Sequence, residues 1–353
     1  MRTAAILIIF LVRCVYLHPT ELKSILDDAR NNSCIFGPTS MSMFLFNSAN
    51  PEGKGPIGEQ EGCTLITDPS KPIFFLVHGF ISSANTTNNY DLASKLVKKG
   101  GTVFSLDWST AACKNGPPGL KLLEYPEAVK NTREIGQLMA KYVISLVKGC
   151  NIPLNNMTFI GHSLGAHVCS FAAKKIQNTI DDKVELIIGA DPAAPLFEKN
   201  KCNERLCITD AKHIVVLHTS VLGFTNACNP SPCRLIGHVI LQVNGGTKQP
   251  ECAAVDVPCS HTRSLQLLYL MSNTCVYPGV KMPKPTLLGN IFGSTPSYPG
   301  PTTTDCIVLN DQIFNFKPSD KLNEGNYYLF VEKKFPYCTN ESFSCNSLII
   351  PSK

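Results

Sequence analysis

The pentapeptide Gly161–Gly165, with the sequence GHSLG, matches the pattern G-x-S-x-G and places Ser163 at its centre. A serine in this pattern sits on a sharp turn between a strand and a helix, and the flanking glycines let neighbouring backbone approach closely. A strand-like segment precedes the pentapeptide and a helix-forming segment follows it. This context favours a nucleophilic serine over an incidental serine in a tight turn.

A serine hydroxyl becomes a good nucleophile only when a base removes its proton. The α/β-hydrolase fold, in which this motif is typical, supplies an acid and then a histidine further along the chain. Asp191 directly follows an apolar run, which places it at the same edge of a parallel sheet as Ser163. The other downstream aspartates precede that run or lie in loops without such a strand. We therefore predict Asp191 as the acid; its alternative role is to cap the turn.

Four histidines lie downstream of the predicted acid. His213 and His218 flank an apolar run and His238 begins another, so a core or strand-end role is the default for each. His261 follows a cysteine and a serine in a predicted loop, just before a predicted helix. A loop histidine can reach the sheet edge, and the neighbouring cysteine can anchor it. We predict His261 as the general base.

Two backbone N–H groups should stabilise the oxyanion that forms when a serine attacks a carbonyl. One should come from Leu164, directly after the nucleophile and at the positive end of a helix. The other should come from Phe80, in the loop after the first buried strand. Side-chain substitutions would test either donor poorly because both are main-chain groups.

Short apolar runs alternate with helical patterns through the middle of the chain. Runs of this kind suit strands of a parallel sheet that is covered on both faces. They occupy residues 72–77, 102–106, 157–160, 184–189 and 213–217. Apolar residues near a 3.6-residue period predict helices over residues 127–147, 164–176 and 262–271. The alternation predicts an α/β fold with a mostly parallel central sheet flanked by helices.

The last eighty residues are rich in Pro, Gly, Ser and Thr, with one strand candidate at residues 327–331. We interpret them as an extension of the same single domain that adds an edge strand and disulfide-bonded loops. Residues 1–18 predict a signal peptide, with an approximate boundary, because an apolar run follows Arg2. The remaining residues, 19–353, should form the catalytic domain of a secreted protein.

The composition limits the possible function classes. Apolar residues make up 44% of the 353 residues and charged residues 17%, which is typical of a globular chain. The net charge of +5 comes without a dense Lys/Arg cluster, so we expect no nucleic-acid partner. No protein partner is implied, and we expect a monomer.

Sixteen cysteines in a chain with a signal peptide indicate disulfides. Fifteen remain if Cys14 leaves with the signal, so one should be free or bridge two chains. The absence of C-x-x-C spacing argues against a metal site, and we expect no cofactor. Sequons for N-glycosylation begin at Asn31, Asn85, Asn156 and Asn340.

The chain resembles the animal pancreatic lipase family. The resemblance rests on FLVHGF, SLDW, GHSLGAH, GADPAAP, VLHTSVLG, GHVILQVNGG and CSHTR, and it places the family's catalytic positions on Ser163, Asp191 and His261. Within the family the chain is most similar to the venom phospholipase A1 subgroup of wasps and other insects, through DWSTAAC, YPEAVKNTR, CNERLCITDA and NYYLFVEKKFPYC.

The resemblance also implies disulfides. Cys228–Cys233 should be a local loop bridge, while the pairing among the C-terminal cysteines stays open because Cys275 stands alone where the subgroup has an adjacent pair. The other implied pairs are Cys34–Cys113, Cys202–Cys207 and Cys252–Cys259.

Loop length bears on the substrate. Triglyceride lipases of the family carry a long lid between two cysteines, whereas four residues separate Cys228 from Cys233 here. The family's separate C-terminal lipid-binding domain is also missing. Both features favour a phospholipid in a membrane or micelle surface, attacked at its sn-1 ester. Leu222 and Phe224 are candidates for lipid contact, with burial in the core as the alternative.

Two other functions remain open. The same catalytic residues would serve a neutral-lipid (triglyceride) or galactolipid lipase. A lipid-binding or yolk-like protein without activity is the third reading, although such relatives usually lack part of the triad.

Overall fold

The computed structural model describes residues 34–37, 41–115, 121–222, 236–253, 255–273, 275–282, 306–316 and 324–338. Within these residues a single eleven-stranded sheet runs through the molecule in the order β10-β9-β11-β8-β7-β6-β5-β3-β4-β1-β2. No helix in the described part of the chain is both long enough and apolar enough to cross a membrane.

The centre of the sheet is parallel. Strand β3 (Ile73–Val77) lies between β4 (Thr102–Asp107) and β5 (Met157–His162). The parallel pairing continues through β6 (Leu186–Ala190), β7 (His213–His218), β8 (Val239–Val243) and β11 (Gly325–Leu329). Every residue of β3, β5, β6 and β8 is buried, as expected for strands covered on both faces.

Antiparallel strands extend the sheet at both ends. At one end β1 (Ser42–Asn47) pairs with β4 and with β2 (Asn50–Lys54). At the other end β9 (Tyr277–Lys281) pairs with β11 and with β10 (Cys306–Leu309). The C-terminal segment therefore contributes three strands, and the expectation of one edge strand was wrong. Strand β11 lies inside the sheet, between β8 and β9.

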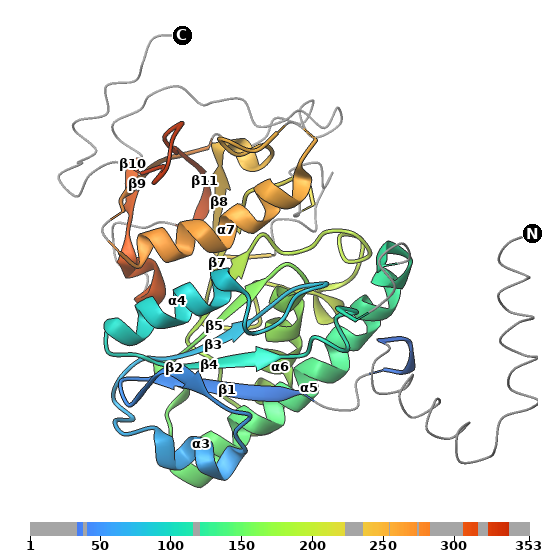
Figure 1. The fold of residues 1–353 in the computed structure, drawn as a ribbon, viewed down its shortest axis with the longest axis vertical. Helices are drawn as coiled ribbons and strands as arrows, with labels where there is room; N and C mark the ends of the chain where they lie inside the picture. The colour runs from blue at the N-terminus through green and yellow to red at the C-terminus, as the bar shows by residue number, and fades with distance from the viewer. Residues whose placement is uncertain are drawn as a thin grey trace, which may run out of the picture.

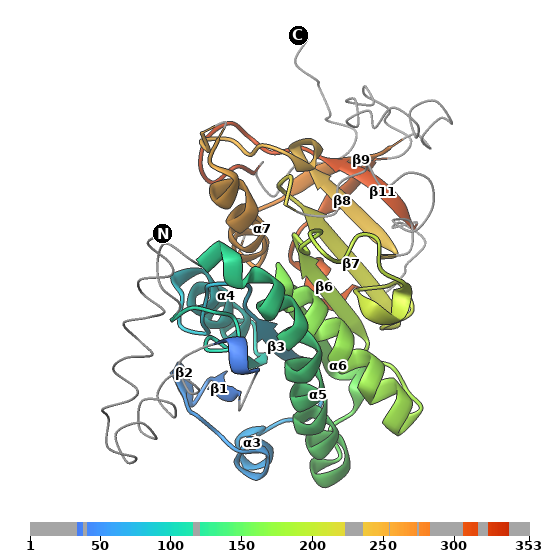
Figure 2. The same cartoon turned by 90° about the vertical axis from the view of Figure 1, so that its right-hand side faces the viewer.

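Helices cover both faces of the sheet. Figure 2 shows α5 (Tyr125–Cys150) and α6 (Leu164–Ile180) on one face, with α4 (Thr87–Lys98) and α7 (Val257–Met271) on the other. The short α3 (Glu59–Leu65) packs against α5. The 3-10 helices are η1 (Cys34–Phe36), η2 (Lys121–Glu124), η3 (Leu154–Asn156), η4 (Cys202–Glu204), η6 (Asn244–Gly246) and η8 (Asp311–Asn315).

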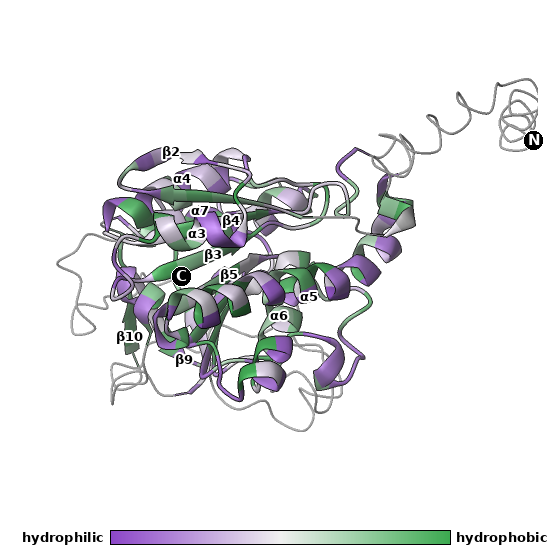
Figure 3. Cartoon of the chain, turned by 90° about the horizontal axis from the view of Figure 1, so that it is seen from below, coloured by the Kyte–Doolittle hydropathy of each residue, from purple (hydrophilic) through white to green (hydrophobic). Residues whose placement is uncertain are grey.

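Each face of the sheet has its own hydrophobic core. Beneath α5 and α6, the Phe75 ring stacks on Phe104 at 5.0 Å and meets Phe159 edge-on at 5.2 Å. Figure 3 shows the central strands in the green of apolar residues, with purple polar residues on the outer helices. The two cores hold the parallel strands rigidly, and so fix the edge at which their carboxyl ends lie.

Several disulfides join these elements. Cys34–Cys113, Cys202–Cys207 and Cys252–Cys259 are the pairs that the resemblance implies. The bond Cys63–Cys150 was not anticipated. Among the C-terminal cysteines, whose pairing was left open, Cys275 is bonded to Cys338, and Cys306 is also disulfide-bonded. Cys169 is free and fully buried. The pair Cys228–Cys233 and the predicted signal peptide lie outside the described residues.

Candidate active site

Ser163 occupies a strained turn between β5 and α6. Its backbone angles are φ 56° and ψ −121°, a region that residues with a side chain rarely adopt. The Ser163 N–H donates to the carbonyl of Ala190, 3.0 Å away, which ties the turn to the end of β6. The turn therefore lies beside the residue that follows β6, which is Asp191.

The two glycines of the pentapeptide are required by close backbone contacts. A Cβ atom at Gly161 would lie 2.5 Å from the backbone nitrogen of Ala166. A Cβ atom at Gly165 would lie 2.2 Å from the carbonyl oxygen of Val77. Neither contact is sterically possible, so only glycine lets α6 start so close to β3 and β5.

Asp191 and His261 form a buried hydrogen-bonded pair. The Nδ1 atom of His261 lies 2.6 Å from Oδ2 of Asp191, which is fully buried, while His261 is 9% exposed. Because a carboxylate only accepts hydrogen bonds, Nδ1 carries the proton and Nε2 is left to accept one. This tautomer is the one that a general base for a serine hydroxyl needs.

Further donors from the loop after β7 surround the Asp191 carboxylate. The N–H groups of Thr219 and Ser220 lie 3.0 and 3.4 Å from Oδ1, and the Ser220 hydroxyl lies 2.6 Å from Oδ2. Burial alone would raise the pKa of Asp191, but the nearby His218 ring and the hydrogen bond from His261 hold it below its ordinary value. Asp191 is therefore an anion at neutral pH.

Sequence reasoning missed Ser220 and Thr219. The signal that could have found them is their position directly after β7, which pairs with β6 so that Ala190 lies opposite Leu217. The residues after the two strands must then meet at the same edge. His218 also lies at this edge, with Nδ1 3.8 Å from Oδ1 of Asp191.

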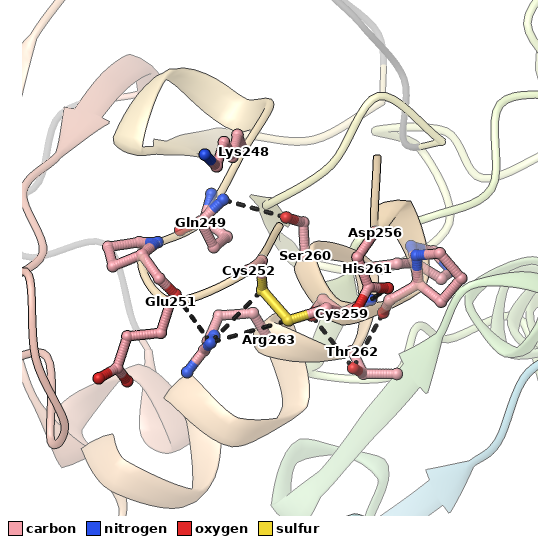
Figure 4. The surroundings of a disulfide bond; sticks show 12 residues. Lys248, Gln249, Glu251, Cys252, Asp256, Cys259, Ser260, His261, Thr262 and Arg263 are labelled. Carbon is pink, nitrogen blue, oxygen red and sulfur yellow. Dashed lines mark hydrogen bonds between the residues drawn. A yellow bond between two sulfur atoms is a disulfide. The ribbon is translucent and has the colours of Figure 1, made fainter. Parts of the chain in front are cut away.

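His261 lies in helix α7 and not in a loop, which corrects the expectation. The Asp256 side chain accepts a hydrogen bond from the Cys259 N–H, and Pro258 occupies the first turn, so α7 begins at Val257. Figure 4 shows the Cys252–Cys259 disulfide beside this turn. Cys259, two residues before His261, therefore anchors the histidine by fixing the first turn of α7 to Cys252.

His162 joins the nucleophile turn to α7. Its ring centroid lies 4.6 Å from that of His261, and its Nε2 lies 3.3 Å from the His261 carbonyl oxygen. Burial, together with the nearby His261, lowers the pKa of His162 to about 3, so it stays neutral. Because Ser163 follows His162 directly, these contacts bring the serine turn, Asp191 and His261 to one edge of the sheet.

The loop after β3 approaches the serine from the other side. A Cβ atom at Gly79 would lie 2.7 Å from the Ser163 Cβ. The Trp108 N–H donates to His78 Nε2 at 3.0 Å, so His78 Nδ1 carries a proton and donates to the Gly79 carbonyl, also at 3.0 Å. In a trans peptide that carbonyl and the Phe80 N–H point in opposite directions, so His78 fixes the direction of the Phe80 N–H.

The N–H groups of Phe80 and Leu164 have no other hydrogen-bond acceptor in the described part of the chain. Neither donates a hydrogen bond to another group within the described residues. Both are therefore available to an oxyanion near Ser163.

A family model for Lipase matches residues 36–337. The chain belongs to the Lipase family. Phospholipase A1 of Solenopsis invicta is 40% identical over 97% of this chain and 98% of its own length. Phospholipase A1 of Dinoponera quadriceps is 46% identical over 89% of this chain and 80% of its own, and that of Vespula vulgaris is 35% identical over 94% and 93%.

The remaining predicted site residues of this lipase are divided between described and undescribed segments. Leu222 lies beside the site, 37% exposed, and its N–H donates to the Ser220 hydroxyl at 3.1 Å. Phe224 lies outside the described residues, as do the sequons at Asn31 and Asn340. Asn85 is exposed, whereas the Asn156 amide donates to the Pro69 carbonyl at 2.9 Å.

One group of potential metal ligands exists among the described residues of the lipase, formed by Cys34, Cys113 and Glu124. The two sulfur atoms are bonded to each other, so they cannot act as thiolate ligands. This group therefore offers only one carboxylate to a metal.

Proposed function

We propose that this lipase is a secreted phospholipase A1 that releases the sn-1 fatty acid of glycerophospholipids and leaves a 2-acyl lysophospholipid. The proposal rests on one observation: the chain shares 40% sequence identity with phospholipase A1 of Solenopsis invicta over nearly the full length of both chains. The site geometry supports the same chemistry, because a strained serine, an Asp–His pair and two available N–H groups gather at one sheet edge.

In the proposed mechanism His261 Nε2 removes the proton of the Ser163 hydroxyl as its oxygen attacks the sn-1 carbonyl carbon. Asp191 holds the imidazole in the required tautomer and stabilises the cation that forms. The negative charge on the former carbonyl oxygen rests on the N–H groups of Phe80 and Leu164. His261 then protonates the departing lysophospholipid oxygen, and water releases the fatty acid from Ser163 by the reverse sequence of proton transfers.

Secretion is supported by the disulfides. Such bonds form in oxidising compartments, and the structure contains several across the whole chain. The apolar run in residues 4–12 is the segment that would direct export. The mature protein would then meet phospholipid from outside the cell that makes it.

Hydrolysis of a phosphatidylcholine with two different acyl chains tests the proposal. Mass spectrometry of the first products should show the sn-1 fatty acid and the 2-acyl lysophospholipid. Ser163→Ala should lower kcat by about 10⁵- to 10⁶-fold without unfolding the protein, as judged by circular dichroism. Initial release of the sn-2 chain would contradict the proposal.

Two further measurements separate the alternatives. Triglyceride hydrolysis far above phospholipid hydrolysis would instead support a neutral-lipid lipase. Failure of a serine-reactive phosphonate to label Ser163 in folded protein would point to a lipid-binding protein without activity.

A further inference from the structure

Large apolar side chains are exposed on the loops around the Ser163 edge of the sheet. Protein surfaces rarely leave several such side chains bare in one region unless the region binds something. We call this set the apolar rim. It comprises Leu122 (80% exposed), Leu123 (75%), Leu196 (55%), Val221 (51%), Leu222 (37%) and Val255 (89%).

The topology places the whole rim at the active-site edge. Leu122 and Leu123 lie in the connection from β4 to α5, and Leu196 lies five residues after Asp191. Val221 and Leu222 follow β7, and Val255 lies between β8 and α7. Each connection leaves the carboxyl end of a parallel strand. The start of α5, which follows the η2 turn that carries the two leucines, projects past this edge on the right of Figure 1.

Contacts between the loops make the rim continuous with the catalytic residues. The Phe80 ring meets the Tyr125 ring edge-on at 5.2 Å, and the Tyr125 hydroxyl donates to the Pro195 carbonyl at 3.2 Å. The preceding residue, Ala194, donates its N–H to the Leu222 carbonyl at 2.9 Å. A chain of contacts thus runs from the oxyanion loop, past the start of α5, to the loop that follows β7.

The two most prominent leucines are held outward on a braced element. They occupy η2, and the Lys121 ammonium group donates to the Lys114 carbonyl at 3.0 Å. The Cys113 sulfur, bonded to Cys34, lies 3.5 Å from the Glu124 carbonyl oxygen at the other end of η2. The element is thereby fixed at both ends, with both leucines in solvent.

We infer that the apolar rim inserts into the outer layer of a phospholipid bilayer, with Leu122 and Leu123 as its main anchor. This inference rests on the proposed function. The rim borders Ser163, so a protein partner seated on it would cover the nucleophile, whereas a lipid layer brings the ester to it. Lys121, directly beside the leucines, supplies a cation at the depth of the lipid phosphates.

Vesicle binding of Leu122→Ser/Leu123→Ser tests the inference. Sedimentation with vesicles of 1-palmitoyl-2-oleoyl phosphatidylcholine should use the Ser163→Ala background, so that the vesicles stay intact. If both leucine side chains are buried in the bilayer of the bound state, their loss should weaken partitioning onto vesicles by about 100-fold or more. The matched control is Leu122→Met/Leu123→Met, which keeps the apolar area and should bind like the parent protein.

Activity measurements with Ser163 intact separate docking from chemistry. The variant Leu122→Ser/Leu123→Ser should lose vesicle hydrolysis in proportion to its loss of binding. It should still hydrolyse dihexanoyl phosphatidylcholine, supplied below its micellar concentration, within about twofold of the parent rate. Equal vesicle binding by the serine variant and the parent would overturn the inference. Absence of hydrolysis of both lipid forms by the parent would instead overturn the proposed function, without affecting the binding result.

A fluorescence measurement tests the same inference without relying on the folding of the double serine variant. The chain has one tryptophan, Trp108, which is 1% exposed. In Leu122→Trp the new indole should shift its emission to the blue on vesicles and be quenched by brominated lipid chains. An emission spectrum that vesicles leave unchanged would count against insertion at this position.

Discussion

A single carboxylate oxygen receives two hydrogen bonds in this site. Both the Ser220 hydroxyl and His261 Nδ1 lie 2.6 Å from Oδ2 of Asp191, and 3.4 Å from each other. The Leu222 N–H donates to the same hydroxyl, which directs the hydroxyl proton towards Asp191. We therefore expect Ser220 to hold the carboxylate in the orientation that His261 needs, as a positioning residue.

Removal of this hydroxyl should impair catalysis more than stability. Hydrogen bonds to charged groups contribute about 1.5–3 kcal/mol, so Ser220→Ala should lower kcat by about tenfold or more with little change in KM. Ser170→Ala is the matched control, because the buried Ser170 hydroxyl donates to the buried Asp210 at 2.7 Å, away from the site. An equal fall in kcat for both variants would refute a positioning role.

Two buried histidines should make the fold sensitive to acid. Burial lowers the pKa of His162 and of His167 to about 3, from an ordinary value of 6.5. Between these values the unfolded chain binds more protons than the folded protein, so the free energy of unfolding falls as the pH drops from 6.5 towards 3. Asp191, whose pKa is lowered, loses its stabilising effect only below its ordinary value of 3.8.

Urea unfolding at pH 7 and pH 5 measures this effect. Each histidine should lower the free energy of unfolding by about 2 kcal/mol over that interval. His167→Gln should remove about half of the pH dependence, whatever its effect at pH 7. A stability that is equal at the two pH values would show that these rings are protonated in the folded state.

At this scale the order of residues along the chain predicted Ser163, Asp191 and His261 as one constellation, and their placement at one edge of the sheet supports that prediction. It was not enough to select Ser220. A serine in the segment VLHTSVLG has no distinguishing chemistry until the pairing of β6 with β7 places it beside Asp191.

Among the elements, the start of α7 decides where His261 lies. The sequence predicted a helix from residue 262, with His261 in the loop before it. The Asp256 cap and the tolerance of proline in a first turn bring the helix start forward by five residues. Strand β9 was missed for a similar reason, since Pro278 and Gly279 are typical of turns.

Loss of the Asp256 cap should therefore affect both folding and catalysis. Asp256→Ala should cost about 1 kcal/mol of stability and lower kcat several-fold, because the first turns of α7 carry His261. The Asn310 side chain caps η8 by accepting from the Gln312 N–H at 3.0 Å, and η8 contacts the amino end of β5 through Thr158. Asn310→Ala should lower the melting temperature while kcat stays unchanged. An unchanged kcat in both variants would contradict the link between the Asp256 cap and His261.

For the whole molecule, the alternation of strands and helices predicted the parallel centre of the sheet and its helical layers. It could not predict which distant cysteines pair. Cys63–Cys150 joins α3 to the end of α5 across 87 residues, and Cys275–Cys338 spans 63 residues. Such pairs depend on the packed arrangement of whole elements, which no local pattern contains.

Two disulfides should differ in what they support. Removal of Cys63–Cys150 by double serine substitution frees a long loop in the unfolded chain and should cost about 4–5 kcal/mol with kcat unchanged at 25 °C. Removal of Cys252–Cys259, separated by 7 residues, should cost about 2 kcal/mol but lower kcat, because this bond braces the turn before His261. Urea denaturation and steady-state kinetics on both variants measure the contrast. The reverse pattern of kcat effects would refute it.

The buried thiol of Cys169 has a consequence for biogenesis. Six residues after the nucleophile, it is enclosed under α5, and burial raises its pKa, so the reactive thiolate is suppressed. During oxidative maturation an unpaired sulfur could attack neighbouring bridges and scramble them. Once α6 has packed against α5, this sulfur can no longer take part in thiol–disulfide exchange. The rate at which an alkylating reagent modifies the Cys169 thiol of the folded protein should therefore report how often the core opens.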